Sequence, residues 1–147
     1  MTPIPGPYFR ETWATRRGWM PNRLMLETSF LPCIDFDGPI QILPPGAFRS
    51  YETSQGHRVF LTDRVEPVSD LLLNLFTRMG ADPKYVGFCR SMGFYRMRVS
   101  PKQQEELLPR QAICRLHGQL GPIRPEWEAF LARHDELCLR PDALVLV

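Results

Sequence analysis

Alternation of apolar and polar residues marks one hairpin clearly. Residues 48–53 and 57–63 both alternate in this way, and only Ser54-Gln55-Gly56 separates them. A three-residue connection that contains glycine is typical of a β-hairpin. We expect Gly56 to adopt a positive φ there, because glycine is the residue that tolerates such a conformation.

Further strands are expected on both sides of this hairpin. Residues 24–37 form one or two apolar runs that end at Gly38-Pro39, and residues 94–99 alternate again. The apolar residues 143–147 are expected to dock as a short strand. Residues 8–22 show poor periodicity, which fits either a short helix or an edge strand.

Four helices are predicted after residue 65. The first opens at Glu66-Pro67 and ends at Gly80, with an inward-facing stripe at Leu71, Leu72, Leu75, Phe76 and Met79. The second starts at Asp82-Pro83 and ends at Gly93, and the others cover residues 111–120 and 125–138. Proline in the first turn and glycine after the last turn are the usual signals of helix ends.

This order of elements predicts the fold class. Strands come first and helices later, which favours an α+β fold with a mostly antiparallel sheet, a central hairpin and helices packed on one face. The chain of 147 residues fits one domain, which we place at residues 8–147. The proline-rich residues 1–7 are expected to form a flexible arm.

The composition of the chain limits its possible partners and cellular compartment but does not indicate a reaction. The net charge of +2 does not by itself require nucleic acid, and no apolar stretch is long enough to span a membrane. Cys33, Cys89, Cys114 and Cys138 are widely spaced and lie mostly in apolar runs. They are expected to be buried free thiols in a reducing cytoplasm, and the histidine spacing gives no sign of zinc.

A candidate metal site lies at the end of one predicted strand. Asp35 and Asp37 close the apolar run that begins at Leu31, and residues i and i+2 of a strand project from the same face. Two neighbouring carboxylates can hold Mg²⁺ or Mn²⁺. The alternative is that the pair sits at a solvated strand end and supports the turn at Gly38-Pro39.

A basic surface is predicted on the strand at residues 94–99. Arg96 and Arg98 share a face with Phe94, Lys102 follows the strand, and Arg58 lies on the hairpin. Arginines beside an aromatic ring suit a phosphate backbone and stacked bases. The alternatives are a solvated face with internal salt bridges, or a surface for an acidic protein partner.

Three motifs in this region resemble an uncharacterised family of bacterial proteins. They are Thr-x-x-Gly-x-Arg-Val, Gly-x-Asp-Pro-x-Tyr and Arg-x-Arg-x-Ser/Thr-Pro-Lys, found here as Thr53-Ser-Gln-Gly-His-Arg-Val59, Gly80-Ala-Asp-Pro-Lys-Tyr85 and Arg96-Met-Arg-Val-Ser-Pro-Lys102. The likeness covers roughly residues 33–138.

That layout is similar in turn to a reduced primase-polymerase core of the archaeo-eukaryotic type. The resemblance implies that Asp35 and Asp37 match an Asp-x-Asp metal motif, and that residues 54–58 occupy the place of a motif on the following hairpin. Such cores carry a third acidic residue on a later strand, where this chain has Arg96 and Arg98. A two-metal centre usually needs more than two carboxylates.

These observations lead to one hypothesis and two rivals. The first is binding of a nucleotide, DNA or RNA through a basic sheet face, as a non-catalytic relative of a primase core. The rivals are a metal-dependent phosphoryl or nucleotidyl transferase that uses Asp35 and Asp37, and a structural subunit that binds an acidic protein. A single site requires Asp35, Asp37, Arg58, Arg96 and Arg98 to line one cleft.

Overall fold

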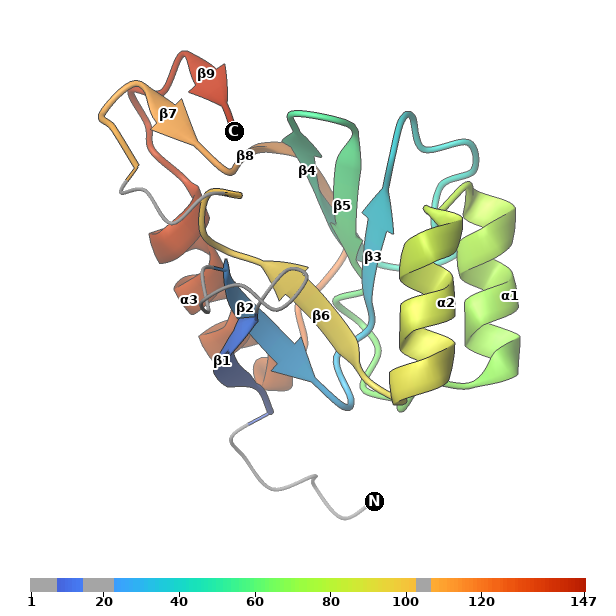
Figure 1. Cartoon of the computed structure of the whole chain (residues 1–147). Coiled ribbons are helices and arrows are strands. Elements are labelled where there is room, and N and C mark those ends of the chain that lie inside the picture. Colours follow the sequence, from blue (N-terminus) through green and yellow to red (C-terminus); the bar gives the residue numbers. More distant parts are fainter. Residues whose placement is uncertain (1–7, 15–22, 103–106) are drawn as a thin grey trace.

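The computed structural model of the chain describes residues 8–14, 23–102 and 107–147 (Figure 1). The arm predicted at residues 1–7 lies outside the described residues. The α+β class is confirmed by two antiparallel sheets and three α-helices. The strands are β1 (Arg10–Ala14), β2 (Arg23–Thr28), β3 (Cys33–Phe36), β4 (Phe48–Thr53), β5 (His57–Phe60), β6 (Tyr95–Arg98), β7 (Gln111–Ala112), β8 (Cys114–Leu120) and β9 (Val145–Leu146). The helices are α1 (Asp70–Met79), α2 (Pro83–Met92) and α3 (Glu128–Cys138), the last preceded by a 3-10 turn at Pro125–Trp127.

The strands form two main sheets. One has the order β1-β2-β6 and the other the order β3-β5-β4-β8, with antiparallel pairing throughout. The short strands β7 and β9 pair in parallel near the C-terminus. The predicted hairpin is confirmed as β4 and β5, which occupy the middle of the four-stranded sheet. Strand β1 is an edge strand, one of the two forms expected for that region.

Gly56 is required by this hairpin for a reason different from the one predicted. The expected positive φ is wrong, because the glycines with positive φ in the described chain are Gly38, Gly80, Gly93 and Gly121. Gly56 instead lies directly against the backbone of Phe36 and Gly38, where a Cβ atom would overlap the Phe36 carbonyl oxygen. Its backbone packs against the end of β3, which leaves no room for a side chain.

Helices α1 and α2 end where the sequence predicted. Gly80 and Gly93 follow them in the left-handed conformation, with φ of 98° and 79°. Helix α1 begins at Asp70 and not at Glu66-Pro67, because the Ser69 hydroxyl caps it by accepting from the Leu72 amide. Most of the predicted stripe is buried, but Leu71 is 80% exposed and does not belong to it.

The helix predicted at residues 111–120 is wrong. This segment forms β7 and β8, and β8 pairs with β4 along its whole length. Ala112, Ile113, Leu116 and Leu120 happen to have helical spacing, yet Leu116 and Leu120 are half exposed or more. Antiparallel pairing with β4 satisfies the backbone of this segment, and local periodicity carries no information about that distant partner.

Helix α3 packs on the hairpin through an aromatic cluster. Phe60 of β5 contacts Trp127, Phe130 and His134 at ring-centroid distances of 5.6, 5.2 and 4.9 Å. Figure 1 shows α1 and α2 together beside β3, whereas α3 lies on the other side of the molecule. The packing of all helices on one face of a sheet stays a prediction.

None of the helices described in the structure combines the length and the apolarity that crossing a membrane requires.

Candidate functional site

A cleft of about 620 Å³ lies where the two main sheets meet. Strands β2 and β6 form one wall, and the end of β3 with the β4–β5 turn forms another. The start of α2 completes it through Asp82, Lys84, Tyr85 and Phe88. The cleft therefore joins segments from five parts of the sequence.

Cationic side chains dominate the lining of this cleft. Six of them line it in the described chain, against three carboxylates. The cations are Arg23, Arg58, Lys84, Arg96, Arg98 and Lys102. An excess of positive charge in a concave, partly desolvated surface raises the local concentration of anions.

The predicted alternation on β6 is confirmed and explains how its arginines reach the cleft. Tyr95 and Met97 are buried, so Arg96 and Arg98 project from the opposite face. The Arg96 guanidinium lies 4.1 Å from the Phe88 ring centroid and forms an ion pair of 3.9 Å with Glu27. Glu27 also holds Arg10 at 3.1 Å, so its carboxylate is shared between two cations.

Arg98 is held differently. It donates to the main-chain oxygens of Ser100 and Val147, and within the described ranges no Asp or Glu side chain forms an ion pair with it. Burial, followed by the neighbouring charges of Arg58 and Arg23, lowers the pKa of Arg98 to about 10. The side chain therefore remains cationic at neutral pH, and an anion in the cleft would relieve this repulsion.

The carboxylates gather at one end of the same cleft. Asp35 and Asp37 both line it, as does Asp82, whose backbone amide donates to the Asp35 carbonyl oxygen at 2.9 Å. Burial raises the pKa of Asp35, and the charges of Asp82 and Asp37 add to this effect against those of Arg58 and Arg98. Asp82 is a third acidic residue that the sequence analysis did not assign to the site.

These three carboxylates do not form a compact cation cage. The only described group of three ligand atoms within 4.8 Å of one another belongs to Cys114, His134 and Cys138. Mg²⁺ commonly binds one or two carboxylates and keeps several waters, so the acidic end can contact such an ion without enclosing it.

Arg58 lies at the floor of the cleft and is only 3% exposed. Its Nη1 donates to the Arg98 carbonyl oxygen at 3.0 Å and lies 3.1 Å from His134 Nε2. Burial opposes its charge, but Cys114, Cys138 and Asp35 outweigh burial and raise the pKa of Arg58. Arg58 is therefore a buried cation that borders the cleft, and its role in phosphate binding stays a prediction.

Phe94 is placed outside this cleft. It lines a neighbouring hollow of about 320 Å³ with Tyr8, Phe9 and Arg10, and it packs against Phe88 at 5.6 Å. Phe94 precedes β6, so strand alternation did not determine where its ring points. The other predicted residues, Asp35, Asp37, Arg58, Arg96, Arg98 and Lys102, line the cleft together.

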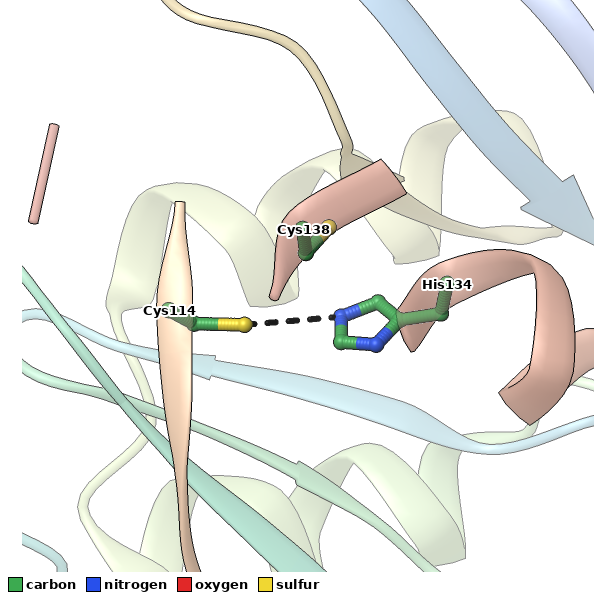
Figure 2. A group of neighbouring side chains, drawn as sticks. All are labelled: Cys114, His134 and Cys138. Carbon is green, nitrogen blue, oxygen red and sulfur yellow. Dashed lines mark hydrogen bonds between the residues drawn. The ribbon is translucent and has the colours of Figure 1, made fainter. Parts of the chain in front are cut away.

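A second polar cluster lies beneath the cleft (Figure 2). Cys114 at the start of β8 faces His134 and Cys138, which lie one turn apart on α3. Cys114 Sγ is 3.9 Å from His134 Nε2, and all three side chains are buried. A hydrogen bond with Cys138, aided by His134 and Arg58, lowers the pKa of the Cys114 thiol to about 5 against the effect of burial.

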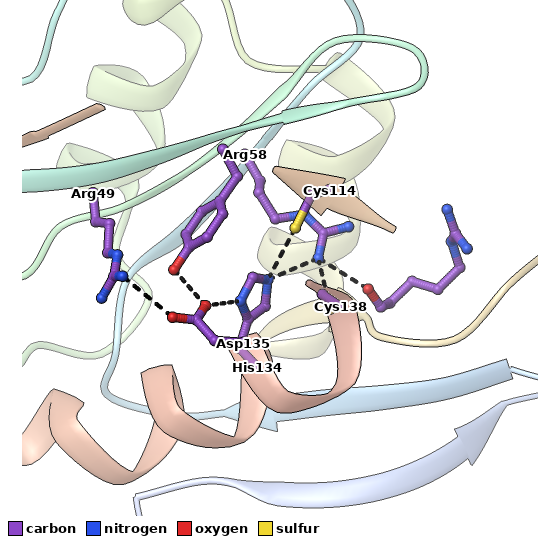
Figure 3. Close-up of polar contacts among 8 residues, drawn as sticks. Arg49, Arg58, Cys114, His134, Asp135 and Cys138 are labelled. Carbon is purple, nitrogen blue, oxygen red and sulfur yellow. Dashed lines mark hydrogen bonds and ion pairs between the residues drawn. The ribbon is translucent and has the colours of Figure 1, made fainter. Parts of the chain in front are cut away.

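Asp135 anchors this cluster from the other side (Figure 3). His134 Nδ1 lies 3.0 Å from Asp135 Oδ1, and the Tyr51 hydroxyl donates to the same oxygen at 2.6 Å. Arg49 forms an ion pair of 3.3 Å with Asp135 Oδ2. The carboxylate can only accept, so His134 carries its proton on Nδ1 and turns Nε2 toward Arg58 and Cys114.

The expectation of buried free cysteines is confirmed for all four thiols. Sequence reasoning nevertheless missed that two of them meet a histidine. The signal was the spacing of His134 and Cys138, because residues i and i+4 of a helix share one face. No sequence pattern links these residues to Cys114, which joins them through the packing of β8 against α3.

Comparisons of this chain with protein-family models, with curated proteins and with solved structures found no match. The resemblance to a bacterial family and to a primase core therefore stays a prediction.

Proposed function

We propose that this protein binds a phosphate-bearing ligand, either a nucleotide or a strand of DNA or RNA, in the basic cleft. The supporting observation is that six cationic side chains from several elements line one concave surface. Phosphate contacts from arginine and lysine supply most of the sequence-independent affinity for nucleic acids. The volume of about 620 Å³ falls within the range of small-molecule sites.

The arrangement of the cations supports this proposal over a face that is neutralised internally. Glu27 forms ion pairs with both Arg96 and Arg10, so the charge of Arg96 is partly neutralised within the protein. Arg98 forms no ion pair with an Asp or Glu side chain of the described residues and contacts main-chain oxygens instead, and Lys84 is exposed at the start of α2. Arg98 and Lys84 are the described cations that we expect to contribute most to phosphate binding.

Salt dependence of binding provides the test. Fluorescence anisotropy would use labelled single- and double-stranded DNA and RNA and a fluorescent nucleoside triphosphate. The logarithm of the affinity for a polynucleotide should fall linearly with the logarithm of the salt concentration, since each phosphate that the protein neutralises releases counterions. Lys84→Ala and Arg98→Ala should each lower the slope by about one unit if each residue holds one phosphate.

Two control variants separate the cleft from other surfaces. Arg115 is a half-exposed cation on β8 that pairs with Glu52 outside the cleft, so Arg115→Ala should leave the slope unchanged. Phe94→Ala should leave affinity unchanged if the ligand stays within the cleft, because Phe94 lines the neighbouring hollow. Absence of binding to every probe at low salt would eliminate this proposal and favour an acidic protein partner.

A second candidate function is metal-dependent phosphoryl or nucleotidyl transfer. It is favoured by Asp82, which adds a third carboxylate to Asp35 and Asp37 at the acidic end. Mg²⁺ or Mn²⁺ held there would bridge to phosphate oxygens and neutralise the charge that develops during transfer. Millimolar Mn²⁺ should then raise the melting temperature, and the double change of Asp35 and Asp37 to Asn should abolish that rise.

A further inference from the structure

The buried cluster beneath the cleft has the dimensions of a metal site. The ligand atoms of Cys114, His134 and Cys138 all lie within 4.8 Å of one another. In a tetrahedral zinc site with Zn–S near 2.3 Å and Zn–N near 2.0 Å, neighbouring ligand atoms are roughly 3.5–3.8 Å apart. The distance of 3.9 Å from Cys114 Sγ to His134 Nε2 needs little adjustment to reach that value.

The surroundings of His134 match those of a metal-ligating histidine. In such a histidine the N–H group of the second ring nitrogen usually donates a hydrogen bond to a carboxylate, which fixes the orientation of the ring and its tautomer. Asp135 fills this role at 3.0 Å from Nδ1, and it is held in turn by Tyr51 and Arg49. Nε2 thereby faces Cys114 (Figure 3), and Cys138 Sγ lies within 4.8 Å of both ligand atoms.

Arg58 competes with a metal for the same space. Its Nη1 lies 3.1 Å from His134 Nε2 and 4.0 Å from Cys138 Sγ. An ion bound to Nε2 requires Nη1 to withdraw, and the Arg98 carbonyl oxygen at 3.0 Å already offers it a partner. Two thiolates and a neutral histidine balance a divalent ion, so the guanidinium can remain as a donor to a ligating sulfur.

A route to the cluster exists from the surface. Cys114 lines a hollow of about 310 Å³ formed with residues of β8 and of the segment that follows α3. This hollow lies apart from the basic cleft, since the two have no lining residue in common. A metal can therefore reach Cys114 without entering the proposed phosphate site.

We infer that Cys114, His134 and Cys138 bind a zinc ion that joins β8 to α3 and keeps one coordination position for water. Two thiolates and an imidazole select zinc or a similar soft divalent ion over Mg²⁺ or Mn²⁺. The site is thus distinct in chemistry from the acidic end of the cleft.

Cobalt substitution tests this inference directly. The full chain, prepared without metal under reducing conditions, is titrated with Co²⁺ and followed by absorbance. One equivalent should produce the thiolate-to-cobalt charge-transfer band and the intense visible bands of a tetrahedral ion, and Zn²⁺ should displace them. A folded wild-type chain that gives neither band, or that gives them only at a large excess of Co²⁺, would overturn the inference.

Variants assign the ligands. Cys114→Ser and Cys138→Ser should each weaken or abolish the charge-transfer band, whereas Cys33→Ser should leave it intact because that buried thiol lies outside the cluster. Asp135→Asn should keep the band and lower affinity by about 10- to 100-fold, as expected for a residue that orients a ligand. An equal response of the Cys33 and Cys114 variants would show that the metal binds elsewhere.

Discussion

Removal of the Tyr51 hydroxyl tests how the buried cluster is stabilised. Tyr51 is fully buried, and its hydroxyl donates to Asp135 Oδ1 at 2.6 Å. Tyr51→Phe deletes one oxygen atom and leaves the ring packed against Phe60 and His134. The change therefore reports on the hydrogen bond with little effect on core volume.

The expected cost follows from the charge of the acceptor. Hydrogen bonds to charged groups contribute about 1.5–3 kcal/mol to stability. Asp135 keeps His134 at 3.0 Å and Arg49 at 3.3 Å, so we expect a loss near the middle of that range, about 2 kcal/mol. For a chain of this size that corresponds to a fall in Tm of roughly 4–8 °C.

The loss of stability in Tyr51→Phe should depend on pH, and the pKa of Asp135 determines in which direction. Burial would raise the pKa of Asp135, but hydrogen bonds from His134 and Tyr51 outweigh burial and lower it below 3.8. A carboxyl whose pKa is lower in the folded state contributes stability above its unfolded pKa and loses it as pH falls through the folded pKa. The difference between wild type and Tyr51→Phe should thus be constant near neutrality and shrink below about pH 4.

Urea unfolding between pH 7 and pH 3, in the presence of a chelator, measures both effects. Tyr85→Phe is the matched control, because the Tyr85 hydroxyl donates at 2.7 Å to the uncharged Cys33 carbonyl oxygen. It should cost about 0.5–1.5 kcal/mol at every pH. The reasoning is refuted if Tyr51→Phe costs no more than Tyr85→Phe, or if its cost does not change with pH.

Three further predictions concern single positions. Gly56→Ala should destabilise the fold by about 1–3 kcal/mol in urea unfolding, because the new Cβ atom would overlap the backbone at the end of β3. Gly87→Ala is the control: Gly87 has open space around it, so the change should be neutral or slightly stabilising. Asp35→Asn should raise the melting temperature at pH 7 and not at pH 3. Burial raises the pKa of Asp35, so its ionisation lowers the stability of the folded protein as pH rises above 3.8. An equal effect at both pH values would contradict this. Ser69→Ala should cost about 1 kcal/mol by thermal unfolding, and a neutral result would show that the Leu72 amide has another acceptor.

Elements with local signals could be predicted from the sequence. Gly80 and Gly93 mark the ends of α1 and α2, and the alternation along β6 correctly separated the buried Tyr95 and Met97 from the two arginines. Each of these features depends on residues a few positions apart. The conformational preferences of these residues and the burial of one face therefore determine such features independently of distant segments.

Features that depend on distant partners could not be predicted. Residues 114–120 have helical spacing, but their partner in the sheet is β4, more than sixty residues earlier. Asp82 lies at the acidic end of the cleft, where its amide donates to the β3 carbonyl of Asp35. In each case a non-local backbone pairing decides the outcome, and the pattern of a short window does not contain it.

Arg58 is the physical link between the cleft and the buried cluster. One side chain borders both, with its guanidinium shared between the Arg98 backbone and His134. Any ligand that redirects this guanidinium in one compartment changes the free energy of binding in the other, and reciprocity makes the two effects equal. If the cleft holds the proposed phosphate ligand and the cluster the proposed zinc ion, the affinity of the cleft depends on metal content as well as on salt concentration.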